Sequence, residues 1–164
     1  MIVVSDATPL RHLIAIGRAD LLRALFGKVI VPTAVLGELQ HHSTPAVVRA
    51  WVDGLPGWVE VRSPSDSRLP AGGNGLDAGE REAICLTLEL RADLLLMDDR
   101  AGRECALRLD LPVTGTRGVL EQADVEGLLA DLPGTLAELQ ASGFYVSGRL
   151  TDAVLRRWRA RHSQ

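Results

Sequence analysis

Apolar residues occur in short runs and in helical repeats, and the two patterns alternate along the chain. Runs rich in Val, Ile and Leu predict five strands, at residues 2–5, 28–31, 58–61, 93–97 and about 112–114. Between them, apolar residues recur at helical spacing, as at 83, 84, 86, 88 and 90. Strands that alternate with helices indicate parallel pairing, with helices on both faces of the sheet. We therefore predict an α/β fold.

Helix boundaries are predicted from hydroxyl, proline and glycine residues. Thr8-Pro9 and Thr44-Pro45 each predict an N-cap followed by the first helical residue, and Thr151 predicts the N-cap of the last helix. Gly127 and Pro133-Gly134 predict breaks in the helical region near the C-terminus.

Two segments predict irregular structure. Residues 62–75 are rich in Ser, Pro, Gly and Asp and predict a loop, while residues 143–147 predict a bend or short extended piece. Gly72-Gly73-Asn74-Gly75 lacks the Lys and Ser/Thr of a phosphate-binding loop, so we interpret it as flexible chain beside the site.

At this length we expect one domain. Residues 1–147 form its body, and residues 148–164 form a basic helix that joins this domain or acts as an interface arm.

Composition and charge narrow the class of protein. No apolar run approaches the ~20 residues of a membrane span, and the first ten residues lack the features of a signal peptide, so we expect a cytoplasmic protein without membrane contact. Cys85 and Cys105 lack metal-ligand spacing, and we interpret them as small buried hydrophobic residues in a reducing compartment. The net charge of −3 divides into +4 from Arg149 onward and −7 on residues 1–148. This division predicts an acidic body with a basic tail.

Acidic residues stand at the ends of the predicted strands, where α/β sheets bind their ligands. Asp6 follows the first strand, and Asp98 and Asp99 follow the fourth. Glu80 lies in the first turn of the helix before the fourth strand, and Glu38 lies in the helix after the second. If the strands share one carboxyl edge, Asp6, Asp98 and Asp99 are neighbours there.

A cluster of carboxylates predicts a cation. Like charges repel one another and lose solvation, so a fold tolerates them when a positive ion lies among them. Mg²⁺ and Mn²⁺ are hard ions that prefer oxygen ligands and retain several waters. Such a site suits phosphodiester cleavage, because the ion activates a water and neutralises charge on the phosphoryl oxygens.

Each acid also has a purely structural interpretation. Asp6 suits a turn or an N-cap, Asp77-x-x-Glu80 forms a capping box, and Glu38 suits a solvated helix surface. One residue of the pair Asp98-Asp99 is expected to cap the following helix. The joint pattern nevertheless favours a metal site over independent structural roles.

Five blocks of the sequence resemble, in order, the PIN-domain family. They span residues 3–10, 31–39, 76–84, 95–100 and 113–120, and together cover roughly residues 1–147. The resemblance implies a three-layer α/β/α sandwich with a central, mainly parallel sheet, Mg²⁺ or Mn²⁺ as cofactor, and hydrolysis of RNA phosphodiester bonds. It also implies the toxin of a type II toxin–antitoxin pair, homodimeric and held silent by a cognate antitoxin protein.

Position by position, the resemblance assigns catalysis to four acids, Asp6, Glu38, Glu80 and Asp99. In this hypothesis Asp6 and Asp99 bind the metal directly. Glu38 and Glu80 bind the metal or its waters. Asp98 is an alternative ligand, because Met97 stands where the family commonly has a hydroxyl residue. A water activated by the metal then attacks the phosphorus in line.

Several polar residues are assigned supporting roles. Thr8 matches a small polar position that orients Asp6 or a water on the metal. Thr114 and Thr116 are candidates to line the site, and Thr116 equally suits an N-cap. Three arginines of the tail are candidates for contact with RNA phosphates or a partner, with a solvated helix face as the alternative: Arg156, Arg157 and Arg159.

Two other classes of function stay open. Glu80 and Met97 depart from the common family pattern, which favours a catalytically weak or inactive PIN-like binding or assembly module. An Asp pair after a strand also occurs in small α/β phosphohydrolases and receivers. We find no suitably placed Lys after a later strand, however, and the acids fall in a different order, so this class is the weaker one.

Overall fold

A computed structural model describes residues 1–70, 75–144 and 148–163 of the chain. Its sheet has five strands, β1 (Val3–Ser5), β2 (Val29–Pro32), β3 (Val59–Arg62), β4 (Leu94–Leu96) and β5 (Val113–Thr114). All neighbouring strands pair in parallel, in the order β3-β2-β1-β4-β5. The five predicted strands and their parallel pairing are thus confirmed. The predictions for residues 71–74 and 145–147 lie outside the described residues.

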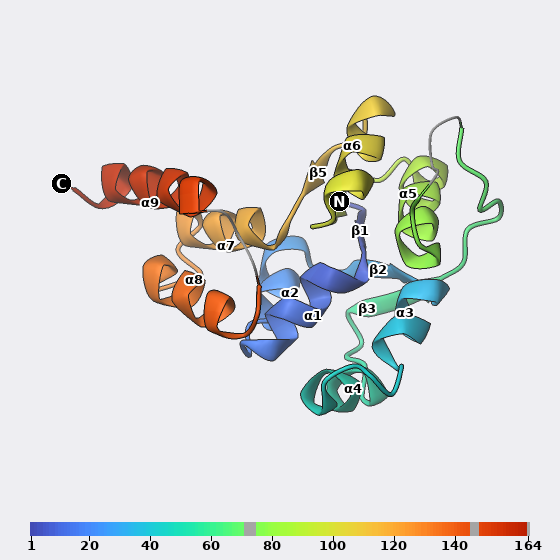
Figure 1. Cartoon of the computed structure of the whole chain (residues 1–164), viewed down its shortest axis with the longest axis horizontal. Helices are drawn as coiled ribbons and strands as arrows, with labels where there is room; N and C mark the ends of the chain where they lie inside the picture. Colours follow the sequence, from blue (N-terminus) through green and yellow to red (C-terminus); the bar gives the residue numbers. More distant parts are fainter. Residues whose placement is uncertain (71–74, 145–147, 164) are drawn as a thin grey trace.

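Helices connect and cover the strands (Figure 1). They are α1 (Ala7–Ala15), α2 (Asp20–Phe26), α3 (Thr33–Leu39), α4 (Ala46–Asp53), α5 (Ala78–Leu90), α6 (Arg100–Arg108), α7 (Thr116–Val125), α8 (Leu132–Ala141) and α9 (Gly148–His162). Figure 1 shows α8 and α9 extending beyond the sheet toward the C-terminus.

The sheet separates two apolar cores, because successive residues of a strand point to opposite faces. Val3 of β1 packs with residues of α1, α2, α7 and α8 on one face. Val4 of the same strand packs with residues of α5 and α6 on the other face. Cys85 and Cys105 are buried free thiols, as expected of small hydrophobic residues. The predicted three-layer α/β/α sandwich is confirmed.

Several predicted helix starts are wrong. Helix α1 begins at Ala7, so Thr8 and Pro9 lie in its first turn and Asp6 occupies the N-cap position. Thr44 also is not a cap, because its hydroxyl donates to the carbonyl of Glu38 at 3.0 Å. Thr151 lies inside α9. Proline is tolerated throughout a first turn, so a Thr-Pro pair locates a helix start only to within a few residues.

The predicted break at Pro133-Gly134 is also wrong, because these residues form the first turn of α8. Asp131 occupies the N-cap, and its carboxylate accepts a hydrogen bond from the amide of Gly134 at 3.0 Å. The side chain of Asp131 therefore starts the helix that the proline alone was expected to interrupt.

The basic helix α9 is held to α7 by ion pairs. Arg157 donates from Nε and Nη2 to the carboxylate of Glu121 at 2.6 and 2.9 Å. Arg161 Nη2 donates to Asp124 Oδ2 at 2.9 Å. Val154 of α9 is buried against the core that includes α8. In the part of the chain that the structure describes, no helix is long and apolar enough to cross a membrane.

Candidate active site

The order of strands brings two acidic segments together at the carboxyl edge of the sheet. Strands β1 and β4 are neighbours, with Ser5 in register with Leu96. The amide of Asp6 donates to the carbonyl of Leu96 at 2.9 Å. The residue that follows β1 therefore lies beside the end of β4, which leads into Asp98 and Asp99.

Asp6 is buried among other acids. It is only 3% exposed, and its side chain makes no cap hydrogen bond to α1 although the backbone has N-cap geometry. Burial, helped by the charges of Asp77, Glu80 and Glu38 and opposed by the Ala7 amide, raises the pKa of Asp6 to about 7. This carboxylate is poorly compensated by the described protein groups.

Gly79 lies close to two carboxylates of the cluster, and the tightest contact a side chain there would make is with Val35. A Cβ on this residue would lie 3.6 Å from Asp6 Oδ1 and 3.5 Å from Asp77 Oδ1. It would also lie 3.2 Å from Val35 Cγ2 of α3. The first turn of α5 thus packs against α3 and β1 with an acid on either side of a residue that has no side chain.

Glu38 joins this cluster from α3. Glu38 is exposed to solvent on one side, and partial burial with the charge of Asp77 raises its pKa, while Arg11 lowers it. Helices α3 and α5 pack against each other, which carries Glu38 toward Asp77 although 39 positions separate them in the sequence. The charges of both residues act on Asp6.

Glu80 caps its own helix and also belongs to the acid cluster. Its backbone amide donates to Asp77 Oδ1 at 2.8 Å, and its Oε2 accepts from the amide of Asp77 at 3.1 Å, which completes a capping box. Burial also raises the pKa of Glu80 to about 7, and the charges of Asp77 and Asp99 contribute to this rise, against the lowering effect of the Asp77 amide. Glu80 therefore caps α5 while it faces the acids of the neighbouring segment.

Asp98 and Asp99 point to different surroundings. Both oxygens of Asp98 are taken by Thr116, whose amide and hydroxyl donate to them at 2.7 and 2.6 Å. Asp99 caps α6 by accepting from the amide of Gly102 at 2.8 Å, and its charge acts on Glu80. The structure thus directs Asp99 toward the acid cluster and Asp98 toward α7.

Met97 fills the position where the family commonly has a hydroxyl residue. It is fully buried in the core beneath α5 and α6. A Cβ on Gly102 would collide with its Sδ, so the absence of a side chain at Gly102 leaves room for the methionine. The departure from the family pattern therefore serves packing on the α6 face.

The supporting threonines lie in different places. Thr8 is half-buried in the first turn of α1, two residues from Asp6. Thr116 is the first residue of α7 and holds Asp98. Thr114 lies at the end of β5 and lines a separate pocket between α6, α7 and α9. Among the tail arginines considered, Arg157 is already paired with Glu121, while Arg156 and Arg159 are exposed.

Two residues near the cluster are not expected from the sequence pattern. The sequence motif at Asp77 predicts only capping, yet its charge raises the pKa of Asp6, Glu38 and Glu80. Arg11 belongs to no motif, although its charge lowers the pKa of Glu38. The signal for Arg11 was its place near the start of a helix that follows directly on Asp6.

The donor set fits a hard divalent ion that keeps much of its own water. The four acids that act on one another here, Asp6, Glu38, Asp77 and Glu80, offer only oxygen atoms. Within the described ranges, no three Asp, Glu, His or Cys side chains already form a group that could hold a metal. Mg²⁺ needs only one or two direct carboxylates, so the open cluster is compatible with it.

Comparison with known proteins agrees with the family resemblance seen in the sequence. A family model described as a PIN domain matches residues 2–160. The chain belongs to the PIN-domain family. PIN domains are typically nucleases and usually use divalent metal ions. None of the curated proteins matches this PIN domain.

A solved structure shares the fold. It is a PilT N-terminus domain protein from the hyperthermophilic archaeon Sulfolobus solfataricus P2, similar at a TM-score of 0.53 and 21% identity. The similarity covers 75% of this PIN domain chain and 93% of the archaeal chain. At this identity the likeness supports the fold alone.

Proposed function

We propose that this PIN domain is a Mg²⁺- or Mn²⁺-dependent endoribonuclease. The observation that carries the proposal is the burial of Asp6 among Glu38, Asp77 and Glu80 at the carboxyl edge of the sheet. A buried carboxylate surrounded by like charges is destabilising unless a cation compensates it. Ligand sites of parallel α/β sheets lie at this edge.

The proposed roles divide among the acids according to their surroundings. Asp6 and Asp99 hold the ion directly, since they follow the neighbouring strands β1 and β4. Glu38 and Glu80 hold the ion or orient its waters, and Asp77 keeps Glu80 in place through the capping box. A divalent ion bound here would lower the pKa of a water and offset the charge that develops on the phosphoryl oxygens.

Cleavage of RNA by purified variants tests the proposal. Asp6→Asn and Asp99→Asn should each lower the rate in Mg²⁺ or Mn²⁺ by about a hundredfold or more, because each removes a proposed ligand charge. Asp53→Asn is the matched control, since Asp53 is exposed at the end of α4. Unchanged cleavage by both site variants would refute the proposed mechanism.

The participation of Glu80 in a capping box supports one alternative, a catalytically weak or inactive PIN-like binding module. Titration of the protein with Mn²⁺ in a calorimeter separates the two. Binding that is lost in Asp6→Asn supports the nuclease. Absence of binding at millimolar Mn²⁺ supports the binding module.

We also propose that the protein is a homodimeric toxin silenced by a cognate antitoxin protein. The support is the resemblance to small prokaryotic members of the family. Co-expression with the adjacent reading frame should yield a stable complex and relieve growth inhibition by the nuclease. Light scattering during size exclusion should give twice the mass of the chain. Growth that is unaffected by the protein expressed alone would argue against the toxin role.

A further inference from the structure

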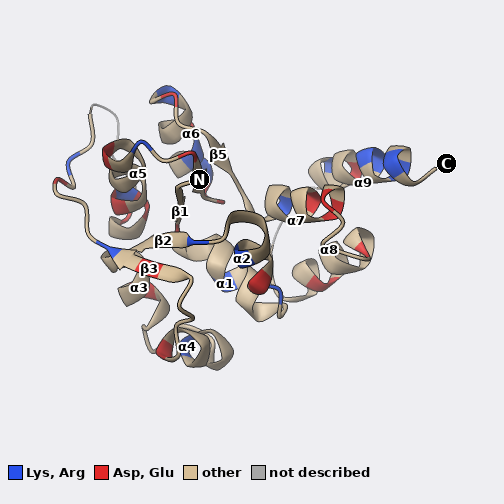
Figure 2. Cartoon of the chain, turned by 180° about the vertical axis from the view of Figure 1, so that it is seen from behind, with Lys and Arg blue, Asp and Glu red and all other residues tan. Residues whose placement is uncertain are grey.

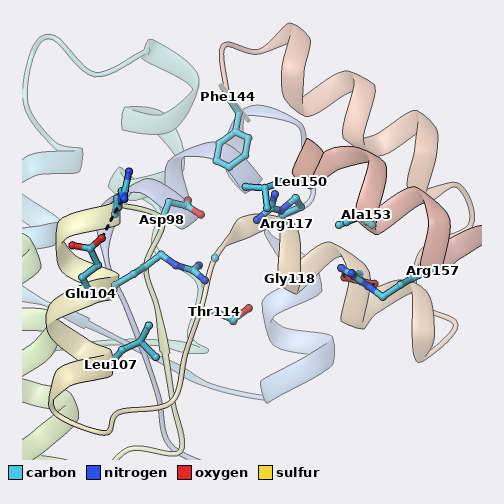
Figure 3. Close-up of a pocket in the computed structure, with 15 residues that line it drawn as sticks. Asp98, Glu104, Leu107, Thr114, Arg117, Gly118, Phe144, Leu150, Ala153 and Arg157 are labelled. Carbon is cyan, nitrogen blue, oxygen red and sulfur yellow. Dashed lines mark hydrogen bonds and ion pairs between the residues drawn. The ribbon is translucent and has the colours of Figure 1, made fainter. Parts of the chain in front are cut away.

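A pocket of about 580 Å³ opens beside the acid cluster, on the other side of the Asp98-Asp99 pair. Residues of α6, β5, α7 and α9 line it. Figure 3 shows Asp98 and Leu107 on one side of this pocket and Arg117 and Leu150 on the other. Its volume lies within the range of about 300–1,000 Å³ that small-ligand sites occupy.

The side chains that line the pocket carry more positive than negative charge, and two of the arginines have no ion pair among the described residues. Four arginines and three acids contribute to its walls. Arg100 pairs with Glu104 at 3.0 Å, and Arg157 pairs with Glu121 at 2.6 Å. The third acid, Asp98, accepts from the neutral amide and hydroxyl of Thr116, and its charge still acts on Arg117. The remaining arginines are Arg103 and Arg117, and neither has an ion pair with an acid in the described ranges.

These two arginines come from facing helices, Arg103 from α6 and Arg117 from α7. Arg117 Nη1 is buried without a hydrogen-bond partner among the described residues. Burial and the charge of Arg103 lower the pKa of Arg117, against the raising effects of the charges of Asp98 and Glu121. Among the described residues, Arg103 Nη1 makes one long bond of 3.3 Å, to the carbonyl of Met97. A bound anion would supply the missing acceptors and relieve the repulsion between the two guanidinium groups.

The rest of the pocket is apolar. Leu107 of α6 is 60% exposed and Leu150 of α9 is 47% exposed, and both line it. Phe144 closes one end, held edge-on against His12 with the ring centres 4.6 Å apart. Two basic groups beside exposed leucines and an aromatic ring suit a ligand that combines a phosphate with a flat apolar body.

We propose that this pocket binds one nucleotide of the RNA strand, with its phosphate on Arg103 and Arg117 and its base against Leu107 and Leu150. The inference rests on the proposed nuclease function. Asp98 lines the pocket, and its neighbour Asp99 faces the acid cluster. A strand that enters the pocket would therefore continue directly into the acidic site, and the pocket sets which part of the RNA reaches it.

Calorimetry with a nucleoside 5′-monophosphate in EDTA tests the pocket without any metal or cleavage. Arg117→Met and Arg103→Met should each weaken binding by about tenfold or more, because each removes a charge-assisted contact. Arg23→Met, on the exposed surface of α2 and outside the pocket, is the matched control and should bind as the unmodified chain does. Arg117→Lys keeps the charge but loses the planar fork, and should bind with intermediate affinity. Thermal unfolding of each variant confirms that it is folded.

Further ligands identify what the pocket accepts. A short RNA oligonucleotide should bind more tightly than the mononucleotide if the phosphate belongs to a strand, and Arg117→Met should weaken both. Binding of inorganic phosphate as tight as that of the mononucleotide would remove the role of the leucine wall and overturn the nucleotide assignment. Binding of an acidic peptide but of no nucleotide would equally overturn it.

The pocket and the nuclease can fail independently. Arg117-dependent nucleotide binding by a protein that cuts no RNA would retain the pocket and refute the nuclease. RNA cleavage by a protein that binds no nucleotide in EDTA would retain the nuclease and refute the pocket. The first experiment needs no metal, and the cleavage assay requires it, so the two results are separable.

Discussion

Asp6 links the acid cluster to the stability of the protein. Burial raises its pKa from 3.8 to about 7. Below pH 4 the carboxyl group is protonated in both the folded and the unfolded chain, so it contributes nothing to the pH dependence of the free energy of unfolding. Between about pH 4 and pH 7 the folded chain binds the extra proton, so the free energy of unfolding falls as pH rises. Above pH 7 the full penalty is present, on the order of 4 kcal/mol for a shift of this size.

We predict that the metal-free protein is less stable at pH 8 than at pH 5. Urea denaturation in EDTA measures this difference, and Mg²⁺ or Mn²⁺ should restore the loss at pH 8 because a cation compensates the ionised carboxylate. Asp6→Asn should reduce the pH dependence, with the raised pKa of Glu80 supplying the remainder, and should remove the stabilisation by metal. Equal pH slopes for the two proteins would show that Asp6 does not ionise in the folded chain as inferred.

The division between Asp98 and Asp99 gives a second prediction at the scale of single residues. Asp98→Ala should lower the free energy of unfolding by about 1–3 kcal/mol, since it leaves the amide and hydroxyl of Thr116 without acceptors. Asp99→Asn should change stability little, because Asn also serves as an N-cap for α6. Chemical denaturation together with RNA cleavage separates the effects. The prediction is wrong if Asp99→Asn unfolds the protein and Asp98→Ala leaves it stable.

At the scale of helices and strands, the apolar pattern was sufficient for the sheet. Each strand is a short apolar run, and burial on both faces leaves little alternative for such a run. Helix starts were predicted less well, because Asp6 and Asp131 occupy the N-caps that were expected to belong to other residues or to a break. Position at a strand end predicted that Asp6 and Asp98-Asp99 would meet. The packing of α3 on α5, which adds Asp77 to the cluster, could not be read from local spacing.

The double role of Glu80 makes it a test of α5. Glu80→Gln should keep the capping box, since a Gln side chain can also accept from the Asp77 amide, while it removes the charge. Glu80→Ala should lose both, and cost about 1 kcal/mol of stability. We therefore expect both variants to weaken Mn²⁺ binding in calorimetry, but only Glu80→Ala to lower the melting temperature. Intact Mn²⁺ affinity in Glu80→Gln would restrict Glu80 to capping.

At the scale of the whole molecule, charge is divided between an acidic body and the basic helix α9 (Figure 2). The sequence predicted this division but not how it is used. Arg157 and Arg161 are engaged by Glu121 and Asp124 of α7 and so anchor α9, which requires knowledge of the fold. Arg156 and Arg159 are exposed and make no ion pair within the described ranges. These two are left to attract RNA toward a net-negative protein.

Replacement of both exposed arginines by glutamine should therefore weaken RNA binding without affecting the fold. Each lost phosphate contact reduces the slope of log affinity against log salt by about 0.7 for a single strand, so the double variant should lose up to about 1.4. Fluorescence anisotropy of a labelled RNA across a salt series measures the slope. In the matched double variant Arg157→Gln, Arg161→Gln, the main loss should be in melting temperature, because both residues anchor α9. An unchanged salt slope in the Arg156→Gln, Arg159→Gln variant would mean that α9 serves only to complete the fold.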